Sequence, residues 1–310
     1  MRFVIIGHVD HGKSTCAGKI LVDTNSVTQS EISEAMREAE INNRKNWLAY
    51  LLDIGEERLR GKTHEHTMID ITYQDKTLTL VDVPGHRNYV PEMVAGCCNA
   101  DVALLVCSAK KGEYESGLKG QTLEHLIIAK TMGIDNLLVA INKMDHETVQ
   151  WDREIYKSIV DKISTVVKKI KFNTVKFVPI SAHTGDNIVH SRGNKEITDN
   201  TLLDKLVKYT SKNKLEPLLM STSRIRAKCM FIHIKSIISI GFSCMLHSMD
   251  NTAECYVTDI ARTPKFIRPS NMQEHIEIEL ELSEGTDIYS RILLRKDDRT
   301  IGMGYILSTN

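Results

Sequence analysis

Gly7-His8-Val9-Asp10-His11-Gly12-Lys13-Ser14 is the stretch from which the architecture of this chain can be worked out. It has the spacing of a phosphate-binding loop, in which four residues separate two glycines and a lysine and a hydroxyl follow. The apolar run Phe3-Val4-Ile5-Ile6 before it predicts a buried strand, and residues 13–22 predict a helix. Strand, loop and helix in this order are the context in which such a loop binds phosphate. A chance Gly-Lys-Ser in an ordinary turn is the alternative.

The residue types in this loop suit phosphate chemistry. Gly7 and Gly12 let the backbone turn its N–H groups inward, and the start of the following helix adds partial positive charge. Lys13 can reach the β and γ phosphates, and the Ser14 hydroxyl can bind Mg²⁺. The residues predicted to hold the phosphates are His8, Val9, Asp10, His11, Gly12, Lys13, Ser14 and Thr15.

Composition describes an ordinary globular protein. The chain has 310 residues, of which 42% are apolar and 26% are charged, so it can form more than one domain. Its formal net charge of zero argues against broad, non-specific binding to nucleic acid. The seven cysteines are an odd number in mostly apolar stretches, as expected of buried thiols in a reducing compartment.

The same features bear on location. The chain begins in the first predicted strand, so we expect no signal peptide, and no apolar run reaches the roughly 18 residues of a membrane span. We expect a monomer that contacts no membrane and lies in the cytoplasm, or in the host cytoplasm if a virus encodes it.

Two further segments resemble the nucleotide-sensing parts of a switch protein. A helical pattern over residues 28–53 is broken by the charged stretch 55–63, where Thr63 is the candidate to close on Mg²⁺ and the γ-phosphate. Strands at 68–73 and 77–81 then lead into Asp82-Val83-Pro84-Gly85-His86. We expect Asp82 to hold Mg²⁺ through water, Gly85 to offer its N–H to the γ-phosphate, and His86 to orient the attacking water. A surface loop histidine is the alternative for His86.

A second group of motifs predicts the base that is bound. A buried strand at 137–141 delivers Asn142-Lys143-Met144-Asp145. The Asp145 carboxylate matches the N1–H and 2-amino donors of guanine, which adenine lacks. We expect Asn142 to brace the loop and the Lys143 stem to cover the base. After a strand at 176–180, the backbone of Ser181-Ala182-His183 can meet the guanine O6.

The remaining pattern completes an α/β domain. Helices are predicted at 87–98, 122–132, 152–170 and 201–209, and a further strand at 102–107. Strands alternating with helices predict a doubly wound, mostly parallel sheet over residues 1–209, with every motif at the carboxyl end of a strand. Three lysines, Lys168, Lys169 and Lys171, favour the C-terminus of a helix; an RNA-binding patch is the alternative.

A different period follows a polar linker at 210–224. Strands are predicted at 227–235, 242–247, 253–260, 275–282, 289–295 and 301–307. The strict alternation over 275–282 gives one apolar and one acidic face. Six short strands in residues 225–310 predict an all-β antiparallel six-stranded barrel without catalytic residues of its own.

With these motifs in order, the chain resembles the translational GTPases. The strings that narrow the resemblance are Arg60-Gly61-Lys62-Thr63, residues 82–91, Lys111-Gly112-Glu113-Tyr114-Glu115, Gly120-Gln121-Thr122, residues 144–151, Tyr289-Ser290-Arg291 and residues 299–302. They are similar to the eukaryotic release-factor GTPase and to the ribosome-rescue GTPase that partners Pelota; elongation factor one alpha is more distant. The resemblance implies GTP and GDP as ligands with Mg²⁺, the ribosome as a partner, and catalytic roles for His86, Lys13 and Thr63.

Two departures from the family matter. Only the linker at 210–224 stands where the family has a middle β-barrel, so we do not expect delivery of aminoacyl-tRNA, for which that barrel is used. His64-Glu65-His66 replaces a valine-rich stretch, although three adjacent strand residues do not all face one metal ion. The resemblance therefore predicts a compact release or rescue GTPase whose last barrel contacts a class I release factor or a Pelota-like protein. A GTP-binding decoy without stimulated hydrolysis is the alternative.

Overall fold

The structure is a computed structural model that describes residues 1–8, 10–43, 46–52, 68–83, 90–98, 100–113, 121–191, 200–209, 220–231, 234, 236–248, 251–269, 274–297 and 299–309. It divides into two compact units, which are taken separately below. Unit 1 consists of Met1–His86, Asn99–Ile127 and Ile134–Asn213, and unit 2 consists of Arg87–Cys98, Ile128–Gly133 and Lys214–Asn310.

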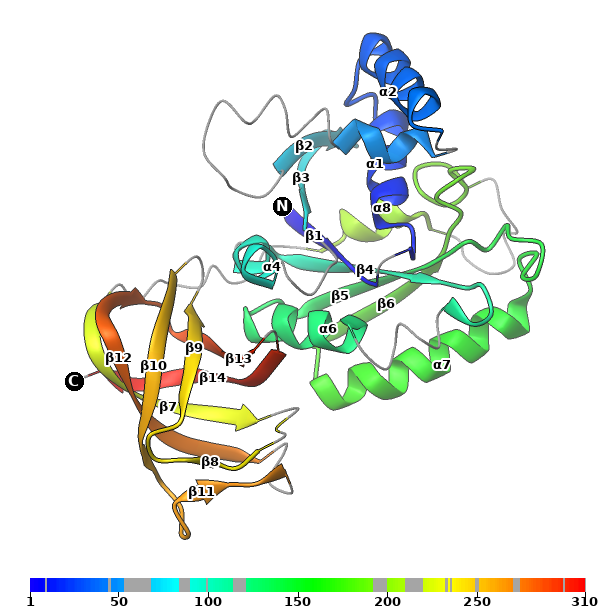
Figure 1. Ribbon diagram of the computed structural model, residues 1–310. Coiled ribbons are helices and arrows are strands. Elements are labelled where there is room, and N and C mark those ends of the chain that lie inside the picture. The colour runs from blue at the N-terminus through cyan, green and yellow to red at the C-terminus, as the bar shows by residue number, and fades with distance from the viewer. Residues whose placement is uncertain are drawn as a thin grey trace. The chain divides into compact units, whose positions relative to one another are not determined.

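Unit 1 is built on a six-stranded sheet with the strand order β2-β3-β1-β4-β5-β6 (Figure 1). The pairs of the sheet are parallel except for β2 and β3, which form an antiparallel hairpin. The predicted α/β fold is therefore confirmed. Its described elements are β1 (Arg2–Ile6), α1 (Lys13–Asp23), α2 (Gln29–Ile41), η1 (Trp47–Ala49), β2 (Met68–Tyr73), β3 (Lys76–Asp82), β4 (Val102–Ser108), α6 (Gln121–Thr131, of which residues 121–127 belong to this unit), β5 (Asn136–Asn142), α7 (Arg153–Ile170), β6 (Thr174–Pro179) and α8 (Leu202–Leu206).

The central strands are apolar because both faces of the sheet are covered. β4 is buried along its whole length, and β5 is buried apart from its first residue. One face packs against α1 and α8 in a single apolar cluster that includes Phe3, Ile20 and Leu203. Figure 1 shows α6 and α7 on the opposite face, where α7 buries Ile159, Ile163 and Val167 at helical spacing.

The strand register brings the ends of the central strands to one edge. Ile6, the last residue of β1, pairs with Leu105, and Ser108, the last residue of β4, pairs with Asn142. Parallel strands place their carboxyl ends together, so the loops that follow them meet there. The predicted motifs follow these strands.

Two helical predictions need correction. The pattern over residues 28–53 forms two pieces, because α2 ends at Ile41 and η1 begins at Trp47. The closing helix predicted at 201–209 is only the five residues of α8. The end of α7 is as predicted from its lysines: Lys168 and Lys169 lie in the last turn, and Lys171 takes the left-handed conformation just beyond it.

Unit 2 contains the predicted six-stranded antiparallel barrel, which closes in the order β10-β12-β7-β14-β13-β9. A two-stranded sheet of β8 and β11 was not predicted. The described elements of unit 2 are α4 (Val90–Cys98), β7 (Met220–Phe231), β8 (Ile238–Ser239), β9 (Ser243–Ser248), β10 (Asn251–Ile260), β11 (Phe266–Ile267), β12 (His275–Ile288), β13 (Arg291–Lys296) and β14 (Arg299–Thr309). The strand expected at 227–235 begins earlier, since β7 starts at Met220, inside the stretch expected to be linker.

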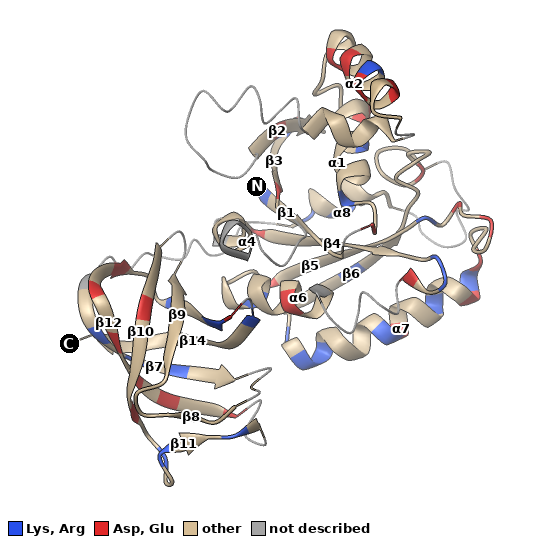
Figure 2. Cartoon of the chain, in the orientation of Figure 1, with Lys and Arg blue, Asp and Glu red and all other residues tan. Residues whose placement is uncertain are grey.

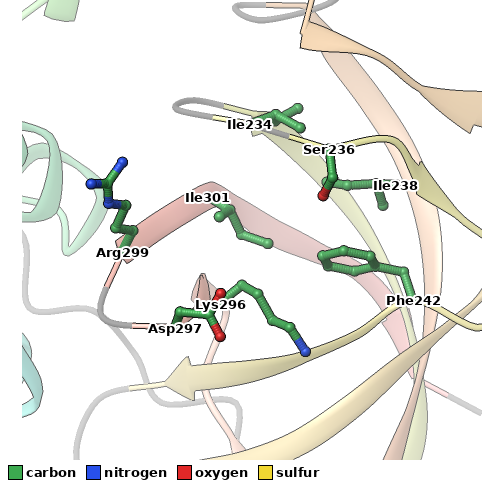
Figure 3. A pocket seen from close by; sticks show the side chains of 8 residues that line it. All are labelled: Ile234, Ser236, Ile238, Phe242, Lys296, Asp297, Arg299 and Ile301. Atoms are coloured by element: carbon green, nitrogen blue, oxygen red, sulfur yellow. The ribbon is translucent and has the colours of Figure 1, made fainter.

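The barrel core follows the predicted alternation. Ile276, Ile278, Leu280 and Leu282 are all buried, and the glutamates between them lie on the other face of β12. Six of the seven cysteines are buried free thiols, as expected. A cavity of about 160 Å³ opens in unit 2, and Figure 3 shows that isoleucines and Phe242 line it together with Lys296. None of the residues predicted to bind nucleotide lines this cavity.

Figure 2 shows Lys and Arg positions interspersed with Asp and Glu positions along the described elements. On neighbouring barrel strands, Arg224 pairs with Glu281 at 3.2 Å and Arg226 with Glu279 at 3.4 Å. These side chains are partly exposed, so each pair contributes little stability, on the order of 0–1 kcal/mol. Among the described residues, no helix is long and apolar enough to cross a bilayer.

Candidate functional site

The loop between β1 and α1 is shaped by two glycines that nothing larger could replace. Gly7 has φ +141° and Gly12 has φ +89°, values that L side chains rarely adopt. A Cβ atom on Gly7 would overlap the carbonyl oxygen of Val106, and one on Gly12 would overlap the side-chain amide of Asn142. The loop therefore lies directly against the ends of β4 and β5.

The first turn of α1 is left open to an anion. Its N-cap, Gly12, carries no capping side chain, whereas Thr28, Asp152 and Thr201 cap the N-termini of α2, α7 and α8. The first N–H groups of a helix have no partners inside the helix and need them from a side chain, water or a ligand. The residues present therefore fit a bound phosphate group at this point.

Lys13 lies at the mouth of the same loop. Its Nζ donates a hydrogen bond to the carbonyl oxygen of His8 at 2.9 Å, and the side chain is largely buried. Burial lowers the pKa of Lys13, while Asp82 and Asp10 oppose that change. Asp82 is the last residue of β3, and both Asp82 and Ser14 are half-buried. A serine hydroxyl and a carboxylate are hard oxygen donors, so the pair fits Mg²⁺ in its chemistry.

Asn142 connects the phosphate loop to the loop after β6. It is 2% exposed, and its Nδ2 donates to the carbonyl oxygen of His11 at 3.0 Å. Its Oδ1 accepts a hydrogen bond from the backbone N–H of Ala182 at 2.8 Å. These two hydrogen bonds support the bracing role expected of Asn142, which stays a prediction.

The predicted base-recognition residues lie around this connection. Lys143 takes the left-handed conformation, with φ +64°, and its Nζ donates to the carbonyl oxygen of Asp10 at 2.8 Å. Asp145 is exposed, as is His183, whereas Ser181 and Ala182 are buried. The N–H groups of Ser181 and Ala182 already donate to Asp186 and Asn142. The predicted contact of this backbone with the guanine O6 remains a prediction.

Three contacts at this edge were not predicted from the sequence. His125, a buried residue of α6, accepts a hydrogen bond at Nδ1 from the N–H of Gly7 at 3.4 Å. The buried His11 donates from Nε2 to the carbonyl oxygen of Glu113 at 3.1 Å. Asn46 donates to the Thr15 hydroxyl at 2.6 Å. Each partner lies far away in sequence, so local pattern gave no signal for them.

Burial lowers the pKa of both histidines. It lowers the pKa of His125 to about 3, and the positive charge of Lys13 and the neighbouring His8 act in the same direction. Burial also lowers the pKa of His11, although the hydrogen bond to Glu113 opposes the change. Neutral rings can accept as well as donate, so His125 can serve as the acceptor for Gly7.

Four predicted site residues, Val9, Thr63, Gly85 and His86, lie outside the described residues, as does His64-Glu65-His66. The described ones fall at the carboxyl ends of β1, β3, β5 and β6. Hydrogen bonds join the phosphate loop directly to the loops after β5 and β4.

Comparisons with known proteins agree with this arrangement. A family profile, that of the elongation factor Tu GTP binding domain, matches residues 1–212. Elongation factor 1-alpha of Saccharolobus solfataricus is 42% identical over 223 residues, which cover 70% of this chain and 51% of that protein. The GTP-binding subunit of the eukaryotic peptide chain release factor of Schizosaccharomyces pombe is 42% identical over 196 residues, which cover 61% of this chain and 30% of that subunit.

Solved structures show the same fold. The GTPase-like domain of S. cerevisiae Ski7, bound to GTP, aligns with a TM-score of 0.78 at 14% identity, over 100% of this chain and 97% of that one. The matched regions span about half or less of the curated relatives' own length. Because the family profile covers more than half of the chain, the chain belongs to the elongation factor Tu GTP-binding domain family of translational GTPases.

Proposed function

We propose that this chain binds GTP and GDP with Mg²⁺ and hydrolyses GTP to GDP and phosphate. The observation that carries the proposal is the hydrogen-bonded meeting of the phosphate loop with the Asn142 and Lys143 loop at one edge of the sheet. The open N-terminus of α1 then receives phosphate, and Lys13 balances its charge. Ser14, Thr63 and Asp82 hold the Mg²⁺.

Guanine is the base in this proposal. The exposed carboxylate of Asp145 accepts from N1–H and the 2-amino group, and a base without those donors leaves it unpaired. The Lys143 stem covers one face of the ring. Within the predicted segment 181–183, the backbone N–H of His183 is the donor assigned to O6, because those of Ser181 and Ala182 donate within the protein.

Hydrolysis depends on a water molecule that is held in line with the γ-phosphate. We assign its orientation to His86 and the closing of the site to Thr63 and Gly85, with Lys13 stabilising the developing charge. A positioned general base or water-orienting group contributes roughly 10²–10⁴-fold to rate. The ribosome supplies the remaining rate acceleration by fixing the position of His86.

We further propose that the chain acts in translation termination or ribosome rescue. Identity of 42% to both an elongation factor and a release-factor subunit supports the family rather than the role. The role rests on the sequence strings at 60–63 and 111–115. The barrel contacts a class I release factor or a Pelota-like protein, aminoacyl-tRNA is not carried, and the site of action is the cytoplasm.

The test is GTP hydrolysis by the purified chain with ribosomes, with and without a eukaryotic release factor or Pelota. His86→Ala is compared with Glu154→Ala, which changes an exposed residue of α7 outside the barrel and outside the predicted site. We expect His86→Ala to keep its GDP affinity within about twofold and to lose stimulated turnover by about 10²-fold or more. The control variant should match the wild type.

The outcomes separate the candidate roles. Turnover that requires both the ribosome and the protein partner supports a termination or rescue factor. Tight GTP binding without stimulated turnover would instead favour the decoy. Equal stimulated rates in the wild type and His86→Ala would remove His86 from the mechanism.

A further inference from the structure

Glu113 has three partners for its carboxylate beside the nucleotide site. Lys143 Nζ and Ser108 Oγ both donate to Oε2 at 2.7 Å, and Lys110 Nζ lies 3.1 Å from Oε1. Ser108 is fully buried at the end of β4, and Lys143 directly follows β5. The carboxylate thus ties the loop after β4 to the loop that carries the base-recognition residues.

The main chain of Glu113 is fixed against the phosphate loop. Its carbonyl oxygen accepts from the buried ring of His11 at 3.1 Å, and its N–H donates to the carbonyl oxygen of Lys110 at 3.2 Å. Glu113 is therefore held from two sides. A carboxylate held in this way can orient a long, flexible lysine at little further cost in entropy.

Lys143 needs such orientation. A non-glycine residue with φ near +64° is in a sparsely populated conformation, which persists where surrounding contacts over-determine it. The Nζ of Lys143 contacts Asp10 in the phosphate loop and Glu113 in the loop after β4, so the amine is held between the two loops. The methylene stem between them is the part expected to cover the base.

We propose that Glu113 is a positioning residue for guanine nucleotides that acts through Lys143 without touching the nucleotide itself. The inference rests on the proposed nucleotide-binding function. His11 fixes Glu113 against the phosphate loop, Glu113 fixes the Lys143 amine, and the Lys143 stem then presents an ordered apolar surface to one face of the ring.

The charge of Glu113 is stable over the working range of a protein. Burial opposes its ionisation, but hydrogen bonds from Lys143, Ser108 and Lys110 outweigh that effect and lower the pKa of Glu113 to about 2. The carboxylate is therefore ionised at neutral pH. The ion pair between Glu113 and Lys143 therefore keeps its negative partner at neutral pH.

This route has a signature that general damage to the site does not share. Glu113 acts on the face of the base, whereas Asp145 reads its edge. Loss of Glu113 should weaken binding of GDP and of inosine diphosphate, which lacks the 2-amino group, by the same factor. The affinity ratio of the two nucleotides should stay constant.

The experiment measures the dissociation constants of GDP and inosine diphosphate by calorimetry on the full chain. The variants are Glu113→Ala, Glu113→Gln, Lys143→Ala and the double variant Glu113→Ala/Lys143→Ala. Glu113→Gln retains the shape and an acceptor for Ser108 if the alanine variant folds poorly. Glu154→Ala is the matched control, because Glu154 forms an exposed ion pair with Lys157 at 3.1 Å on α7.

We expect Glu113→Ala to raise the dissociation constant of GDP about tenfold, as for loss of a charge-assisted hydrogen bond between partly exposed groups. Glu113→Gln should give a smaller rise, and Glu154→Ala should stay within about twofold. In the Lys143→Ala background, Glu113→Ala should have little further effect, because the two changes break one interaction.

Three results would overturn the inference alone: an unchanged GDP affinity in Glu113→Ala, a tenfold loss that persists without Lys143, or a changed affinity ratio between the two nucleotides. If the wild-type chain bound no GDP, the proposed function would fail and this inference with it. The two failures are therefore distinguishable.

Discussion

Replacement of Asn142 by alanine should lower the free energy of unfolding of unit 1, even without nucleotide. The change removes both contacts of a side chain that is 2% exposed: the donor to His11 O at 3.0 Å and the acceptor for Ala182 N–H at 2.8 Å. A buried polar group left without a partner costs about 1–3 kcal/mol. Two such groups together lower the free energy of unfolding by about 2–6 kcal/mol, with the lower end expected where water reaches the loop.

The assay is urea unfolding followed by tryptophan fluorescence. Both tryptophans, Trp47 and Trp151, belong to unit 1, so the signal reports that unit and not the barrel. Asn42→Ala is the control, because Asn42 belongs to unit 1 and donates its side-chain amide to the Glu38 carbonyl oxygen at an exposed site. A loss of less than about 0.5 kcal/mol in Asn142→Ala would contradict the reasoning, since that is the range of ordinary surface changes.

Two further predictions use the same assay. Gly18→Ala should lower the free energy of unfolding by about 1–3 kcal/mol, because a Cβ there would overlap the Leu48 carbonyl group of η1. This loss is expected even though alanine favours helices over glycine. An unchanged or raised free energy of unfolding would show that η1 moves aside at no cost. Stability should also fall as the pH drops below 6.5, because His125 has a pKa of about 3 when folded and about 6.5 when unfolded, so the unfolded chain binds the extra proton between those values. The free energy of unfolding should fall by up to about 1.4 kcal/mol per pH unit for this one proton. In His125→Gln, the urea midpoint should depend less on pH between pH 6.5 and 4. An equal pH dependence in the variant would mean that another group causes the effect.

The sequence predicted the two folds well because their signals are local. Continuous apolar runs mark β4 and β5, which are buried on both faces, and the strict alternation of β12 marks a strand with one wet face. Asp152 and the lysines at the end of α7 mark a helix by its caps. None of these requires knowledge of a distant residue.

The errors fall where a distant partner sets the structure. Ser221 and Thr222, near the start of β7, are polar, yet Met220–Thr222 pairs with the last three residues of β12, Thr286–Ile288. No pattern within residues 210–224 shows that such a partner exists. The same holds for β8, whose partner strand β11 begins more than twenty residues later in the sequence.

The site divides in the same way. Motif spacing found the phosphate loop and Asn142, because these residue types carry their chemistry in a fixed local order. His125 and Glu113 were missed as contributors since their roles come from contacts to Gly7, His11 and Lys143, more than a hundred positions away in sequence for His11 and Gly7. The position of Glu113 just beyond the end of β4, at the edge where the other loops meet, is the signal that could have suggested it.

The strand order of the barrel has a consequence for how the chain is made. β7 is its first strand to be synthesised, but both of its neighbours, β12 and β14, lie in residues 275–309. β7 therefore leaves the ribosome before either of its partner strands has been synthesised. During that time the backbone N–H and C=O groups of β7 have no strand to pair with. Until β14 is complete, the barrel stays open between β7 and β13, and the unpaired edges of these two strands can pair with other chains. Closure of the barrel therefore has to wait for the synthesis of β14.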